Sequence, residues 1–99
     1  MTETSVWSME LAELTKAINH PVRIQILSEL TIGSRIVSEL LDHLMVEPSL
    51  LSKHLAVLRE AGLVECEIEW RCRRYNLRKP QVVKNILAAL SEAVRGSTV

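Results

Sequence analysis

The sequence lacks several features that mark particular classes of protein. It has two cysteines, no phenylalanine and three aromatic residues in 99 positions. Cys66 and Cys72 lie in a chain without a secretion signal, so free thiols are favoured over a disulfide. No apolar run reaches about 18 residues, the minimum for a membrane-spanning helix. The first twenty residues carry Glu3, Glu10 and Glu13 where a signal peptide has basic and apolar residues. We therefore expect a cytoplasmic protein with no membrane partner.

Signatures of catalysis are also missing. Gly33, Gly62 and Gly96 are isolated, so there is no glycine-rich phosphate loop. No Ser-His-Asp or Cys-His combination falls on adjacent predicted elements. We predict that the protein is not an enzyme and has no cofactor. The length predicts a single domain, residues 1–99.

The chain has no excess of either charge, since twelve basic residues balance twelve acidic ones. A neutral balance argues against nucleic-acid binding, because such domains usually carry a basic excess. The distribution argues the other way. Five of the nine residues from Arg71 to Lys79 are basic and none is acidic. Screening over about 8 Å makes such a local cluster matter more than the total.

Hydrophobic periodicity predicts five helices and one β-hairpin. Pro21 and Pro48 stand where helices begin, Ser38 is a candidate cap, and Ile24, Leu27 and Leu30 form the stripe of the second helix. The predicted helices cover about 8–19, Pro21 to Gly33, Ser38 to Leu44, about 48–61 and 81–94, and the hairpin covers about 63–77.

The hairpin has a predictable register. With a two-residue turn at Trp70 and Arg71, Val64 and Cys66 lie beside Tyr75 and Leu77. Glu67 or Glu69 then lies opposite Arg74 or Cys72, and the two cysteines point to opposite faces.

The fourth helix has two unlike faces. At about 100° per residue, one face carries Leu51, His54, Leu55 and Leu58, and the other carries Ser49, Ser52, Lys53, Ala56 and Glu60. Small side chains, hydroxyl groups and a cation at a helix N-terminus suit the major groove of DNA. The same pattern also fits an ordinary solvent-exposed face.

The order of the elements favours DNA binding, because a short helix, a turn, a second helix and a hairpin form a helix-turn-helix with a wing. Residues 10–94 resemble the ArsR/SmtB family of winged-helix transcriptional repressors. The resemblance rests on residues 19–27 (NHPVRIQIL), 37–40 (VSEL), 49–55 (SLLSKHL), 58–64 (LREAGLV) and 73–77 (RRYNL). It implies a mainly α winged helix-turn-helix with a small β-hairpin, in the order α-α-α-α-β-β-α. It also implies a homodimer paired through its first and last helices, which binds an inverted-repeat operator and is released by an inducer.

The resemblance assigns residues to DNA binding. The recognition helix falls on residues 48–61, and Trp70 stands where relatives usually have a glycine or another small residue. The implied DNA contacts are Ser49, Leu50, Ser52 and Lys53 in the recognition helix, and Arg71, Arg73 and Arg74 in the wing.

The first and last helices carry more apolar surface than one small domain can cover, which predicts a dimer interface. The predicted dimerisation residues are Leu11, Leu14, Ile18, Val83, Ile86, Leu87 and Leu90.

No metal site is predicted. The positions where metal-sensing relatives carry a cysteine pair are Ile36 and Ser38, and the last helix has no histidine. A capping role is expected for His20 and a packing role for His54. Two alternatives stay open. Cys72, flanked by arginines, is a candidate redox-sensing thiol. The neutral charge balance also allows a winged-helix module that binds a protein.

Overall fold

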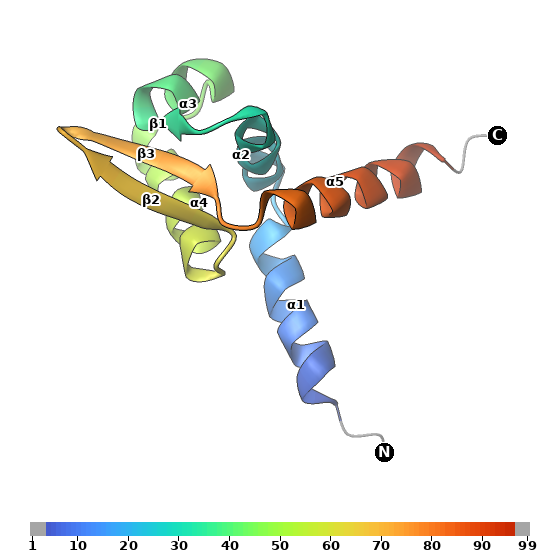
Figure 1. The fold of residues 1–99 in the computed structure, drawn as a ribbon. Coiled ribbons are helices and arrows are strands. Elements are labelled where there is room, and N and C mark those ends of the chain that lie inside the picture. Colours follow the sequence, from blue (N-terminus) through green and yellow to red (C-terminus); the bar gives the residue numbers. More distant parts are fainter. Residues whose placement is uncertain (1–3, 97–99) are drawn as a thin grey trace.

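Residues 4–96 are described in a computed structural model of the chain, in which five helices and three strands follow one another (Figure 1). No membrane-spanning helix is found among these residues. The elements are α1 (Val6–Ile18), α2 (Pro21–Ile32), β1 (Arg35–Ile36), α3 (Val37–Leu44), α4 (Pro48–Glu60), β2 (Val64–Glu69), β3 (Cys72–Leu77) and α5 (Pro80–Arg95).

The core forms around α2, which contacts every other helix and β3. Ile26 and Leu27 of α2 are 0% and 1% exposed, whereas Ile24 is 39% exposed. The predicted stripe was therefore wrong at Ile24. Because other elements contact α2 on several sides, its buried residues do not follow one stripe, and Ile26 is buried where Ile24 was expected. The buried residues from the other elements include Leu40, Leu51, Leu55, Leu58, Val64, Tyr75, Leu77 and Val83.

The strands form an antiparallel sheet in the order β1-β3-β2. The predicted hairpin register is confirmed: Cys66 pairs with Tyr75 and Glu67 with Arg74. Strand β1 was not predicted, because its two residues are too few to show an alternating pattern. It pairs with the outer edge of β3, which fixes the hairpin to the body of the protein.

The first residues of α2 and α3 are set by hydrogen bonds at their N-caps. The predicted cap at His20 is confirmed, since its Nδ1 atom accepts a hydrogen bond from the Val22 N–H at 3.1 Å. The predicted cap at Ser38 was wrong, because α3 begins one residue earlier. There the Ile36 N–H donates to Oε1 of Glu39 at 2.9 Å.

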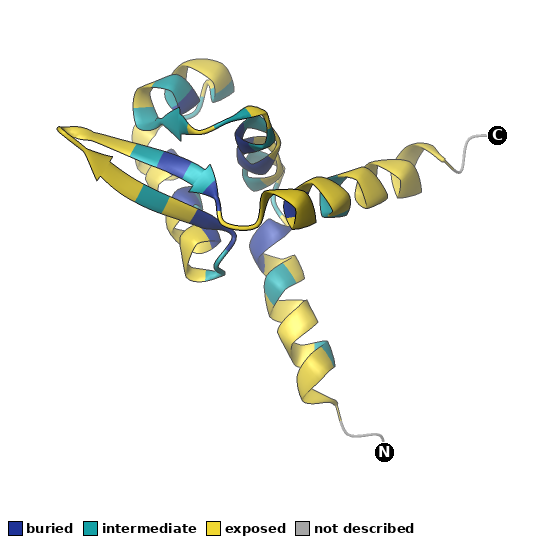
Figure 2. Cartoon of the chain, viewed as in Figure 1, coloured by how far each residue is buried: buried dark blue, intermediate teal, exposed yellow. Residues whose placement is uncertain are grey.

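Helices α1 and α5 extend away from the body in different directions (Figure 1), and most of their length is exposed (Figure 2). The radius of gyration is 15.0 Å, above the value of about 13 Å expected for a compact chain of this length. The two helices therefore give the protomer an open shape.

Candidate nucleic-acid interface

Helix α4 is held by its apolar face and leaves its polar face free. Leu51, Leu55 and Leu58 are 0–2% exposed. Ser49, Ser52 and Lys53 are exposed and make no side-chain hydrogen bond within residues 4–96, and Leu50 is 48% exposed. Glu47, at the N-cap, makes no side-chain capping bond, so it leaves the N–H groups of the first turn uncapped. The N-terminal N–H groups and the polar strip thus face the same solvent region.

The arginines of the wing differ in how far they are bonded within the fold. Arg71 and Arg73 are exposed. Arg74 instead donates to Oε2 of Glu69 at 3.2 Å and to the Ser34 hydroxyl at 3.2 Å, so part of its bonding capacity is used within the fold. Arg71 has no hydrogen bond or ion pair among the described residues. The predicted wing contacts are therefore not equivalent, and Arg71 is the most available of them.

A hollow of about 430 Å³ joins helix and wing. It is lined by Ser52, Ala56, Arg59, Glu60, Arg73 and Tyr75. Ser52 and Arg73, predicted from separate segments of the sequence, thus border one surface. The same hollow brings in Arg59, which the sequence reasoning missed. Its helical spacing from Ser52 and Ala56, at seven and three residues, was the available signal.

Tyr75 is the buried residue among those that line this hollow. Burial, together with a hydrogen bond to the Cys66 thiol, raises the pKa of the Tyr75 hydroxyl, while Arg73 lowers it. Tyr75 is 6% exposed and therefore a packing residue in its neutral form.

The two thiols have different surroundings. Cys66 is half-buried in the pair with Tyr75, and Cys72 is exposed beside the turn, opposite Glu69. This register separates them by three residue pairs along the ladder, too far for a disulfide. Redox sensing through Cys72 stays a hypothesis.

The histidines have partners within the protein. His43 Nδ1 lies 2.5 Å from Oε1 of Glu29, which is also 3.3 Å from Nε of Arg35. The hydrogen bond from His43 is the main cause that lowers the pKa of Glu29. Among residues 4–96, no group of three or more histidine, cysteine or acidic side chains is placed to hold a metal ion.

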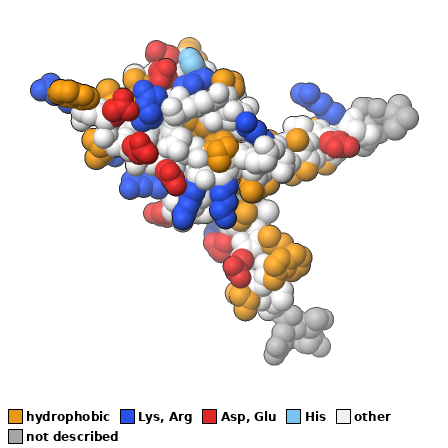
Figure 3. All heavy atoms as spheres, in the orientation of Figure 1, with side chains coloured by type: hydrophobic (Ala, Val, Ile, Leu, Met, Phe, Trp, Pro, Cys, Tyr) orange, Lys and Arg blue, Asp and Glu red, His pale blue; other side chains and the backbone are white. Residues whose placement is uncertain are grey.

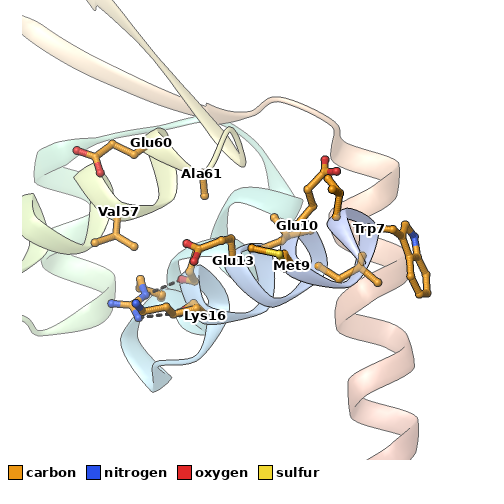
Figure 4. Close-up of a pocket in the computed structure, with 13 residues that line it drawn as sticks. Trp7, Met9, Glu10, Glu13, Lys16, Val57, Glu60 and Ala61 are labelled. Atoms are coloured by element: carbon orange, nitrogen blue, oxygen red, sulfur yellow. Dashed lines mark hydrogen bonds between the residues drawn. The ribbon is translucent and has the colours of Figure 1, made fainter. Parts of the chain in front are cut away.

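A second hollow, of about 1070 Å³, lies between α1 and α4. Figure 4 shows Val57 and Glu60 of α4, with Ala61 directly after it, on one side, and Met9 and Glu13 of α1 on the other. It is open and partly apolar. Exposed apolar side chains continue from it along α1 and on α5, and Figure 3 shows hydrophobic atoms on both helices. They are Val6, Trp7, Met9 and Leu11 on α1, and Val82, Leu90 and Val94 on α5.

The residues predicted for dimerisation divide into three groups. Leu11 and Leu90 are 42% and 48% exposed. Leu14, Ile86 and Leu87 are half-buried against the core. Ile18 and Val83 are 6% and 2% exposed, because the end of α1 and the start of α5 pack on α2. These last two residues belong to the protomer core and offer almost no surface to a second subunit.

The fold and this surface define a winged helix-turn-helix protein, in which α3 and α4 form the helix-turn-helix and β2 with β3 the wing. A sequence model described as "Bacterial regulatory protein, arsR family" matches residues 20–65. The chain belongs to the ArsR family, and the predicted family and fold class are confirmed.

Several relatives are similar along most of the chain. The HTH-type transcriptional repressor SmtB of Mycobacterium tuberculosis is 38% identical over 81 residues, which are 82% of this chain and 60% of that protein. The uncharacterised HTH-type transcriptional regulator Rv0081 of the same organism is 37% identical over 79 residues, 79% of this chain and 69% of that one. The chain thus spans about three fifths of the length of SmtB.

Solved structures agree with these relatives. The crystal structure of Rv0081 superimposes with a TM-score of 0.82 at 33% identity, covering 92% of this chain and 91% of that one. HlyU from Vibrio cholerae gives a TM-score of 0.80 at 33% identity, covering 93% and 98%. The family model and Rv0081 are described as regulators, and neither description names an enzyme.

Proposed function

We propose that the protein is a cytoplasmic, dimeric transcriptional repressor that binds double-stranded DNA at an inverted-repeat operator and is released by an inducer. Ser49, Leu50, Ser52 and Lys53 of α4 contact bases and phosphates in the major groove. Arg71 and Arg73 of the wing contact the adjacent backbone, with a smaller contribution from Arg74.

The observation that carries this proposal is the hollow bordered by Ser52 of α4 and Arg73 of β3. A duplex that enters beside the polar strip of α4 also meets the exposed wing cations. Hydroxyl and cationic side chains at the N-terminal end of a recognition helix contact base edges and phosphates in this class of protein. Helix α4 and the wing thus form two parts of one proposed DNA-binding surface.

The dimer follows from the apolar surface of α1 and α5. Leu11 and Leu90 are large and exposed, and the hollow between α1 and α4, which Leu11 helps to line, has room for side chains of a second subunit. Two-fold pairing places two α4 helices about 34–36 Å apart, one DNA turn, on one side of the duplex. A two-fold protein reads an inverted repeat because each subunit meets the same half-site.

The test is the salt dependence of DNA binding, measured by fluorescence anisotropy on a duplex that the protein selects from a randomised pool. The logarithm of the affinity should fall linearly with the logarithm of the salt concentration, with a slope of about −0.9 per neutralised phosphate. Failure to select any sequence, together with no salt-dependent binding, would overturn the proposal and favour a module that binds a protein.

A further inference from the structure

The tip of the wing carries an unusual residue in an unusual conformation. Trp70 begins the two-residue turn between β2 and β3, with φ of 60°. This is the left-handed region, which glycine adopts freely and which is strained for a bulky residue. Hairpin turns of two residues commonly place glycine or asparagine at such a position. The turn requires this conformation but does not require a tryptophan, so the strain is a local cost of placing a bulky residue here.

Packing within the protomer does not offset this cost. Trp70 is 95% exposed, and Ile68, on the same side of the β2 alternation, is 77% exposed. The tip also lies away from the free ends of α1 and α5, so it is separated from the surface proposed for dimerisation (Figure 1). Strained residues cluster at functional and ligand-binding sites. A binding partner outside the protomer therefore accounts best for a strained and fully exposed tryptophan.

The charges around Trp70 point to DNA as that contact. Arg71 follows it directly without a partner among the described residues, and Arg73 pairs with Ile68 across the hairpin. Figure 3 shows hydrophobic and basic atoms together at the tip. A large apolar side chain flanked by cations matches the wedges that enter the minor groove, where arginines meet the phosphates and the wedge separates bases.

The length of the hairpin is also consistent with a contact in the minor groove. Each wing strand has six residues, which at about 3.4 Å per residue span roughly 20 Å. Adjacent major and minor grooves are about half a DNA turn apart, roughly 17 Å of a turn of about 34 Å. A hairpin of this length is therefore long enough to span from one groove to the next.

We propose that Trp70 inserts into the minor groove beside each half-site and selects operators by deformability. The favoured sequences there are flexible pyrimidine–purine steps such as TA and CA, which unstack at the lowest energy. This inference rests on the proposed DNA-binding function and extends it to bases that α4 does not reach.

The test uses Trp7→Phe as the background in every sample, which leaves Trp70 as the only tryptophan. In the free protein its fluorescence should be quenched efficiently by iodide. The duplex selected by the unmodified protein should protect it from iodide and quench its emission by stacking. Trp70→Gly, which removes the strained residue, should keep the melting temperature. Its affinity should fall about tenfold, a loss typical of removing one aromatic residue that stacks on a base.

Ile32→Ala is the matched control, because Ile32 is 74% exposed and lies outside α4 and the wing. It should bind as tightly as the background protein. Replacing the flanking TA step by a stiff A-tract should weaken the background protein and leave Trp70→Gly unchanged. DNA binding that is equally tight in Trp70→Gly, with Trp70 open to iodide in the complex, would overturn the inference. That result would leave the repressor proposal intact, whereas absence of any DNA binding would overturn both.

Discussion

Nη1 of Arg23, in α2, lies 3.3 Å from Nδ1 of His54, in α4. The same guanidinium donates from Nε to the Ala17 carbonyl at 2.6 Å and from Nη2 to the Lys16 carbonyl at 3.3 Å. The ring of His54 also stands 4.3 Å from that of His20. One arginine in α2 thus joins α4, which faces the proposed DNA, to α1, which carries part of the proposed dimer surface.

Arg23→Ala is expected to lower the free energy of unfolding by about 1–3 kcal/mol. It removes charge-assisted bonds to the Ala17 and Lys16 carbonyl groups. The Ala17 carbonyl then loses its partner, whereas the Lys16 carbonyl keeps the Asn19 N–H at 3.3 Å. Urea denaturation measures this. Arg78→Ala is the control. The Arg78 side chain is 60% exposed and its ion pair with Glu65 is long, at 3.9 Å, so its loss should change stability by no more than about 0.5 kcal/mol. Equal effects of the two substitutions would contradict the role of Arg23.

His54 predicts a pH dependence of stability. Burial, followed by the charges of His20 and Arg23, lowers the pKa of His54 below its ordinary value of 6.5. As pH falls below 6.5, His54 therefore binds a proton in the unfolded chain before it does so in the folded protein. The stabilising contribution is complete above pH 6.5, decreases as pH falls toward the folded-state pKa, and is constant below it.

His54→Gln should remove this part of the pH dependence, since glutamine keeps an acceptor for Arg23 but does not titrate. The measurement is the free energy of unfolding of both proteins at several pH values across this window. A wild-type protein that becomes more stable than the variant as pH falls would show that the sign is wrong.

Lys53 and Ser52 should have separable effects on DNA binding. Lys53→Ala is expected to weaken specific and random duplexes alike and to reduce the salt slope by about 1, because it removes a phosphate contact. Ser52→Ala is expected to relax sequence preference with the salt slope unchanged, because a hydroxyl group near the helix start contacts base edges. Anisotropy titrations on both duplexes at several salt concentrations distinguish the two. Equal losses on both duplexes for both variants would contradict this division.

Arg59 tests whether the hollow between α4 and the wing lies against the DNA backbone. Arg59→Ala should reduce affinity for all duplexes and lower the salt slope by about 1. Lys84→Ala removes the same charge from α5, outside the hollow, and should leave the slope unchanged. If the two variants have the same slope as the wild-type protein, the DNA does not approach this hollow.

Patterns within short segments were enough to predict most of the local structure. The alternation of residues 64–69 and 72–77 fixed the hairpin register, because a two-residue turn leaves one pairing that buries Val64 and Tyr75 together. Proline at the first position of α4 marked its start. Such features depend on neighbours in sequence, so a single chain displays them.

Features that depend on tertiary contacts were not predictable in this way. Arg74 carries the same charge as Arg71, yet the pairing of β1 with β3 brings Ser34 close enough to bond it. Ile18 follows the same stripe as Leu11 but is buried, because the end of α1 meets α2. Periodicity identifies an apolar face without stating which element covers each part of it.

Leu90 provides the test of the proposed dimer. Leu90→Glu places a carboxylate on the apolar face of α5, where Leu90 is 48% exposed. Burying that charge in an interface is unfavourable, so sedimentation velocity should show a shift from dimer to monomer. Ala88→Glu adds the same group two residues earlier, on the opposite side of the helix, and should remain dimeric. Affinity for the selected duplex should fall only in Leu90→Glu, because a monomer holds one half-site instead of two. If both variants sediment as the wild-type protein does and bind the duplex equally, α5 does not form the subunit interface.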